Sequence, residues 1–162
     1  MDTKVWHDFF MASVSSASAL TGLIFVGVSI NITKILSFPK LPDRALLSII
    51  LLLNIFVISF LMLIPNQGYL LVGSEVSAIA VFVYLFITRM DIGIYKNTDT
   101  DYRQQYLISM IYNQLSLLPY LVAGVAIFIC RENGIYWLIP GIVISFIKAV
   151  VDAWVLLVEI NR

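Results

Sequence analysis

The sequence has few charged residues and almost no cysteine or histidine. Only 12% of its 162 residues are Asp, Glu, Lys or Arg, and 60% are hydrophobic, whereas about a quarter of the residues in soluble domains are charged. A soluble fold of this length could not cover so much apolar surface with polar side chains, so lipid must take the place of water. The composition excludes an ordinary soluble domain and indicates an integral membrane protein.

Several classes of function are disfavoured by what is missing. Ten acidic and ten basic residues balance each other without a basic block, so we expect no nucleic-acid partner. Cys130 and His7 are the only residues of their types, which rules out an internal disulfide and leaves both without like neighbours for a metal site. The serines have no adjacent histidine base, and there is no glycine-rich phosphate loop. We therefore expect no enzyme, no metal and no cofactor.

Five apolar segments are long enough to cross a bilayer, which takes about 20 residues. They cover residues 9–32, 45–64, 69–88, 105–129 and 135–158. The linkers "PNQG" (65–68) and "RENG" (131–134) predict tight turns, because Pro, Asn and Gly end one helix and let the next run antiparallel. The sequence thus predicts an all-α integral membrane bundle of five transmembrane helices, forming one domain over residues 1–162.

The first segment, 9–32, is unusual because it carries five serines and one threonine. The triplet "ASA" at 17–19 resembles a signal-peptide cleavage site, but Lys4 before it is opposed by Asp2 and Asp8, and the apolar run continues well beyond it. We expect the segment to be retained. An alternative arrangement has four spans, with this segment re-entrant or lying in the membrane interface.

The positions of Lys and Arg predict the orientation, because these residues concentrate on the cytoplasmic side. With five spans, Lys4 and Arg131 fall on one side of the membrane. The other side holds Lys34, Lys40, Arg44, Arg89, Lys96, Arg103 and Arg162. The N-terminus is then outside and the C-terminus cytoplasmic. The four-span alternative places both termini inside.

A stripe of small residues runs along the first segment. Ser15, Gly22 and Ser29 are seven residues apart and fall near the same face of a helix. Small residues let helices approach closely, which favours packing or self-association. The same hydroxyl-rich face is also a candidate pathway lining, in which hydroxyls replace water around a solute.

Three ionisable residues fall inside predicted spans, where charge is costly and usually functional or paired. Lys148 and Asp152 are one helical turn apart and are expected to form an ion pair on one face. Glu75 has no nearby residue of opposite sign. It is either a protonated carboxyl hydrogen-bonded within the bundle or a cation or proton site.

Asn54 and Asn113 add neutral polar groups at intermediate depth. Two interpretations remain open for them. They line a polar interior together with the ionisable residues, or they form ordinary hydrogen bonds between helices.

Four segments carry a resemblance to known proteins: "WHDFF", "ALTGLIFVGVSIN", "LPDRA" and "DAWVLLVEI". They resemble a widespread group of small bacterial membrane proteins, some of which are labelled modulators of a membrane-bound AAA protease. The resemblance implies a multi-pass protein of the bacterial inner membrane. Its motifs describe helix faces, so it assigns no catalytic or binding residue.

Two functions follow as hypotheses. The first is a homo-oligomeric ion channel or permeation module, because the hydroxyl-rich first segment and the intramembrane charges lie in a chain too small to enclose a wide pathway alone. The second is a non-enzymatic regulatory protein that binds a larger membrane protein through the small-residue face. In both, the lipid bilayer is the surrounding solvent.

Overall fold

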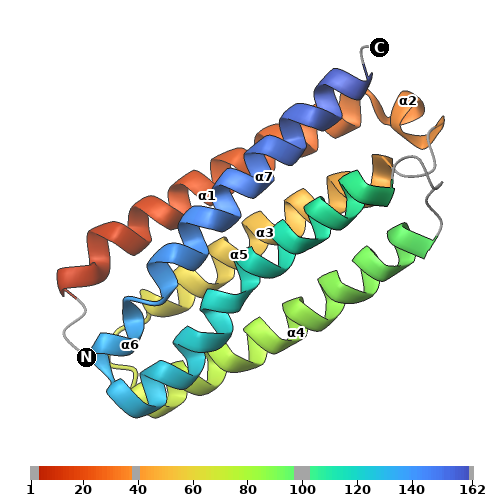
Figure 1. Cartoon of the computed structure of the whole chain (residues 1–162). Coiled ribbons are helices and arrows are strands. Elements are labelled where there is room, and N and C mark those ends of the chain that lie inside the picture. Colours follow the sequence, from red (N-terminus) through yellow and green to blue (C-terminus); the bar gives the residue numbers. More distant parts are fainter. Residues whose placement is uncertain (1–3, 38–40, 97–102, 161–162) are drawn as a thin grey trace.

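The computed structural model describes residues 4–37, 41–96 and 103–160, and five long helices dominate this part of the chain (Figure 1). The long helices are α1 (Lys4–Ile30), α3 (Leu41–Met62), α4 (Tyr69–Lys96), α5 (Arg103–Cys130) and α7 (Leu138–Ile160). Two short helices, α2 (Ile32–Ser37) and α6 (Glu132–Ile135), lie in the connections. The five long helices are apolar and long enough to cross a membrane, and no strand occurs in the described ranges. The predicted all-α, multi-pass bundle is confirmed.

The long helices run antiparallel and give the bundle two distinct ends (Figure 1). We name them the α2 end and the α6 end, after the short helix at each. At the α2 end α1 and α4 finish, α3 and α5 begin, and α7 finishes. α1 is a continuous helix alongside the bundle, packed mainly on α3. This arrangement supports five spans rather than a re-entrant first segment.

The core lies between four of the helices, and α1 is peripheral. α4 packs chiefly on α5, and α3 packs on α1 and α7. Fully buried apolar side chains such as Leu51, Ile55, Val76 and Ile127 fill the centre. Only 17% of the membrane-length stretch of α1 is buried, compared with 56% for α3. One side of α1 is therefore left uncovered by the described part of the chain.

α4 continues two turns beyond the end predicted for the third span. The prediction ended that span at Thr88, before the charged Arg89. In the structure the helix runs to Lys96, with Ile87, Asp91 and Ile94 buried. A spacing of four and then three residues keeps these side chains on one face, so the apolar stripe extends past Arg89, which is exposed. This extension brings Asp91 into the bundle.

The connection at residues 131–134 is more regular than the predicted tight turn. Arg131 adopts a positive φ of 51°, after which the single turn of α6 forms, and α7 begins at Leu138 instead of residue 135. Gly134 lies against the backbone of Ala126 and Ile127 near the end of α5. A Cβ on Gly134 would overlap these backbone atoms. A side chain at this position would therefore push α6 away from α5.

Basic residues gather at the α2 end. Lys34, Arg89, Lys96 and Arg103 are exposed there. Arg44 lies at the same end, close to the start of α3, whereas Arg131 is exposed at the α6 end. Lys40 and Arg162, on which the predicted orientation also rests, are outside the described residues. The unequal distribution of basic residues between the two ends agrees with the predicted spans. Which end of the bundle faces the cytoplasm stays a prediction.

Candidate functional site

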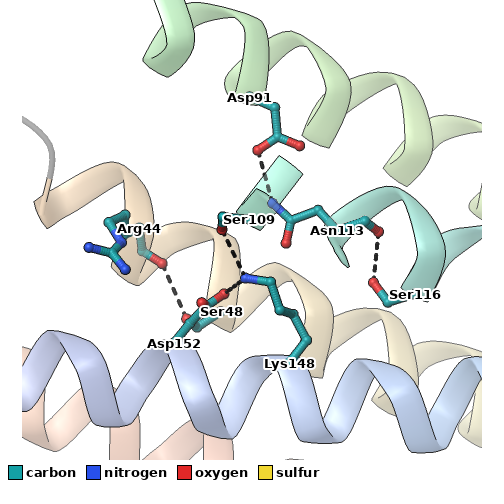
Figure 2. Close-up of polar contacts among 8 residues, drawn as sticks. All are labelled: Arg44, Ser48, Asp91, Ser109, Asn113, Ser116, Lys148 and Asp152. Atoms are coloured by element: carbon teal, nitrogen blue, oxygen red, sulfur yellow. Dashed lines mark hydrogen bonds and ion pairs between the residues drawn. The ribbon is translucent and has the colours of Figure 1, made fainter. Parts of the chain in front are cut away.

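The predicted ion pair on α7 forms inside the bundle. The Lys148 ammonium binds the Asp152 carboxylate one turn further along the helix, and both side chains are largely buried. Lys148 Nζ also donates to Ser109 Oγ of α5 at 3.2 Å (Figure 2). A paired charge with an additional hydrogen bond is the arrangement in which ionised groups tolerate burial. The pair fastens α7 to α5 in the half of the bundle nearer the α2 end.

A second carboxylate, that of Asp91, lies on α4 close to this pair. Asn113 Nδ2 of α5 donates to Asp91 Oδ1 at 2.9 Å (Figure 2). Asp91 is within electrostatic reach of both Lys148 and Asp152. Its other oxygen, Oδ2, and Asn113 Oδ1 are buried and accept no hydrogen bond of good geometry from the described residues, although the Gln114 side chain also lies close enough to interact with the Asp91 carboxylate. Unused acceptor oxygens next to a carboxylate are an environment that favours a proton or a cation.

These groups form a charged cluster contributed by four helices. We use that name for Arg44 of α3, Asp91 of α4, Ser109 and Asn113 of α5, and Lys148 and Asp152 of α7 (Figure 2). Two basic and two acidic side chains balance when all four are ionised. Such balance lowers the cost of keeping charge within the membrane, because the field of each group is offset by its neighbours.

An open cavity of about 260 Å³ gives access to the charged cluster. Its lining combines Arg44, Asp91, Tyr106 and Ser109 with four apolar side chains, Leu47, Ile94, Met110 and Val155. The Arg44 guanidinium lies over the Tyr106 ring, 6.0 Å from its centroid. The cavity is large enough for several water molecules, and its charged walls would hold them. Asp91 is thus one of the residues that line a cavity in the half of the bundle nearer the α2 end.

Buried hydroxyl groups continue from the charged cluster towards the middle of the bundle. Ser116 Oγ donates to the Asn113 carbonyl at 2.7 Å, and Ser145 Oγ donates to the Ser116 carbonyl at 3.4 Å. The Tyr120 hydroxyl donates in turn to Ser145 Oγ at 3.3 Å. Asn54 of α3 lies beside Tyr120. Polar groups thus extend from the cavity to mid-depth, where apolar core residues take over towards the α6 end.

Glu75 is separate from the charged cluster. It lies on α4 sixteen residues before Asp91, which corresponds to about 24 Å along the helix axis. Gln67 Nε2, in the connection before α4, donates to Glu75 Oε2 at 3.2 Å. Glu75 therefore bonds a local amide near the α6 end, and it does not contribute to the cavity.

The small-residue stripe of α1 faces away from the bundle. Ser15, Gly22 and Ser29 are exposed, whereas Ala17 is buried on the opposite side of the helix. The hydroxyls of Ser15 and Ser29 donate to the carbonyls of the preceding turn of their own helix, each at 2.8 Å. The stripe lines no pathway within one copy of the chain.

The sequence predictions found part of this site. Asn113, Lys148 and Asp152 come together, while Asn54, Glu75 and the α1 stripe lie elsewhere. Asp91 was missed because the third span was ended at Thr88. The sequence did contain a signal for the burial of Asp91. Ile87 lies four residues before it and Ile94 three residues after it, and this spacing places Asp91 on the same face of a helix as these two apolar residues.

Among the described residues, no group of three or more His, Cys, Asp or Glu side chains could hold a metal ion. The chain matches no family model, no curated protein and no solved structure.

Proposed function

We propose that the protein is a cation permeation module of the bacterial inner membrane and that the cavity at the α2 end is its cytoplasmic entrance. One observation carries the proposal: Asp91 lines an open cavity inside a membrane span, and its buried Oδ2 accepts no hydrogen bond of good geometry from the described residues. An intramembrane carboxylate beside a cavity is typical of ion and proton pathways.

Asp91 is better suited to exchange a cation than its neighbour Asp152. The Asp152 carboxylate is bound directly by the Lys148 ammonium, so its charge is already compensated. Asp91 is bound by a neutral amide, that of Asn113. A proton or small cation arriving through the cavity would therefore bind at Asp91, with the Lys148–Asp152 pair limiting the affinity by keeping a basic group nearby.

The proposed pathway is closed between mid-depth and the α6 end. Buried apolar residues, including Ile55, Ile58, Val76, Ile127 and Leu138, fill that half. Conduction therefore requires the helices to separate there, or requires a pathway formed between copies. In the second case Glu75, near the α6 end, would contribute one carboxylate per subunit to the opposite mouth.

The proposed orientation follows the basic residues. Lys34, Arg89, Lys96 and Arg103 are exposed at the α2 end, which supports a cytoplasmic location for this end. α7 finishes at that end, so the C-terminus is cytoplasmic as well.

Ion flux through the purified protein in liposomes tests the proposal. With a potassium gradient and a voltage-sensitive dye, the wild type should pass current, and Asp91→Asn should lower the flux at least about tenfold, equivalent to about 1.4 kcal/mol. Asp43→Asn is the matched control, because Asp43 is exposed in the first turn of α3 at the same end. Wild-type liposomes that stay silent over a range of voltage, pH and membrane tension would contradict permeation, and equal flux from Asp91→Asn would remove Asp91 from the pathway.

A regulatory protein that binds a larger membrane protein is the second candidate. It is favoured by the outward face of α1, whose small side chains are suited to close contact with another helix. The sequence resemblance to modulators of a membrane protease implies the same class of function. Silent liposomes combined with a monomeric mass in mild detergent would favour this candidate.

A further inference from the structure

Arg89 lies on a face of α4 that is turned away from the bundle. The neighbours of Arg89 on this face are Leu85, four residues before it, and Ile92 and Lys96, three and seven residues after it. Leu85 is 48% exposed and Ile92 is 41% exposed, and Arg89 between them is exposed as well. Asp91 is buried on the opposite side of the helix. The Arg89 guanidinium is therefore outside the charged cluster, on a face that otherwise meets lipid chains.

The depth of Arg89 places it at the boundary between lipid chains and headgroups. α4 begins at Tyr69, and Arg89 lies twenty residues later, or about 30 Å along the helix axis. This length equals the usual thickness of the hydrocarbon core, about 30 Å. With the Tyr69 ring anchored at one boundary, the Arg89 side chain meets the phosphates of the opposite leaflet. Lys96 lies about 10 Å further on, at the water side of the same headgroup layer.

Arg103, the first residue of α5, adds a third cation beside this face. Its guanidinium lies over the Tyr95 ring, 5.2 Å from the centroid, and Tyr95 directly precedes Lys96 on α4. A contact with an aromatic ring does not use the hydrogen-bond donors of a guanidinium, so they stay available for an anion. We name Arg89, Lys96 and Arg103 the basic face.

The three cations of the basic face have no acidic partner among the described residues. All three are exposed, and none forms a hydrogen bond or an ion pair with the described part of the chain. An arginine offers five N–H donors and a lysine three. Like charges gathered at one place repel one another, and lipid chains offer no acceptor. The basic face therefore suits an anion that carries several acceptor oxygens and is held at the level of the headgroups.

We propose that the basic face binds the headgroup of an anionic phospholipid. The two free oxygens of a phosphate diester match the fork of the Arg89 guanidinium, which can donate two parallel hydrogen bonds to them. Lys96 and Arg103 add attraction for net negative charge, which a zwitterionic headgroup lacks.

The position of the basic face favours a lipid over a soluble phosphate. Leu85 lies on the hydrocarbon side of Arg89 on the same face and is exposed. It can contact the acyl chains of the lipid whose phosphate Arg89 binds, whereas a soluble phosphate has no apolar part to place there. The inference concerns lipid binding, and it is independent of permeation and of which end faces the cytoplasm.

Native mass spectrometry of the purified protein in mild detergent tests the proposal. Phosphatidylglycerol, which is anionic, and phosphatidylcholine, which is zwitterionic, are titrated into separate samples. The wild type should retain phosphatidylglycerol preferentially. Arg89→Gln should weaken this binding about fivefold, which corresponds to the loss of one basic residue near an anionic surface. Arg89→Lys keeps the charge without the fork, so its loss should be smaller. Equal retention of the two lipids by the wild type would overturn the proposal.

Arg131→Gln is the matched control, because Arg131 is an exposed arginine at the α6 end. It removes the same charge and should lower the affinity for phosphatidylglycerol less than Arg89→Gln does. Equal losses from the two variants would mean that only the net charge of the protein matters, and an Arg89→Gln protein with wild-type affinity would remove the basic face from lipid binding. Helical circular dichroism and a single elution peak show that each variant is folded.

Two further measurements separate a lipid from other occupants. Inorganic phosphate in large excess should not displace bound phosphatidylglycerol, and displacement would assign the basic face to a soluble phosphate. In a Cys130→Ser background, Arg89→Cys with lipid-soluble copper phenanthroline should give no disulfide dimer in native membranes. An efficient dimer would show that a second copy of the chain covers this face. Either of these contrary results would overturn the proposal.

Discussion

Gly124 of α5 lies directly against Ser77 of α4, and a Cβ on Gly124 would stand 2.9 Å from the Cα and 3.0 Å from the nitrogen of Ser77. Neither backbone atom can move without shifting its helix. This contact sets how closely α4 and α5 approach, and it thereby positions Asp91 against Asn113, which lie on the same two helices.

Gly124→Ala should therefore destabilise the bundle by about 1–3 kcal/mol, the usual cost of overpacking a core. Gly93→Ala on α4 is the control, because, apart from its chain neighbours and the backbone of its own helix, no heavy atom of the described residues lies within 4 Å of its Cβ position. Alanine there should be neutral or slightly stabilising, since it favours the helix over glycine. Unfolding in mixed micelles measures both, and equal stability of the two variants would contradict the tight contact.

Lys148→Met should cost about 3–5 kcal/mol, because it leaves the Asp152 carboxylate buried without its counter-charge. The double variant Lys148→Met/Asp152→Leu should recover much of this loss, since a pair of apolar side chains replaces the ion pair. A double-mutant cycle on the free energy of unfolding checks the coupling. Additive losses from the two single variants would mean that the pair does not stabilise the fold.

Tyr120→Phe removes the hydroxyl that donates to Ser145 inside the bundle. We expect a loss of about 0.5–1.5 kcal/mol, the net value of an ordinary buried hydrogen bond. Val125→Ala is a suitable comparison, because Val125 is exposed on the same helix and should matter little in detergent. A Tyr120→Phe protein as stable as the wild type would show that the hydroxyl contributes no net stability.

Cys130 should react with a membrane-impermeant thiol reagent added outside spheroplasts. Its side chain is free and exposed at the α6 end, which lies outside the cytoplasm in the proposed orientation. A Cys130→Ser/Thr33→Cys variant carries its thiol at an exposed site in α2 and should react only after lysis. The opposite pattern would reverse the proposed orientation.

The helices were predictable from the sequence because the length of each apolar run is set by the thickness of the bilayer. The connection at 65–68 was also predictable, because Pro65 and Gly68 lie between two apolar runs. In the structure, Asn66 within this connection has a positive φ of 60°. The pairing of Lys148 with Asp152 followed from their spacing alone. These features depend on local sequence, and the structure confirms them.

Features that depend on the arrangement of helices were not predictable from the sequence. The spacing of Ser15, Gly22 and Ser29 defines a face, but it does not say whether that face points towards the bundle or away from it. Similarly, the spacing of Asp91 from Ile87 and Ile94 puts it on their face of the helix, but it is the packing of α4 on α5 that shows which helix this face meets.

The charged cluster has a consequence for how the protein is made. Arg44 leaves the ribosome first, Asp91 follows, and Lys148 and Asp152 emerge after both. When α4 enters the translocon, Asp91 lacks both the Asn113 amide and the balancing ion pair, so exposing it to lipid is costly. We expect α4 to remain beside the translocon until α5 arrives, and the two helices to be released together as a pair.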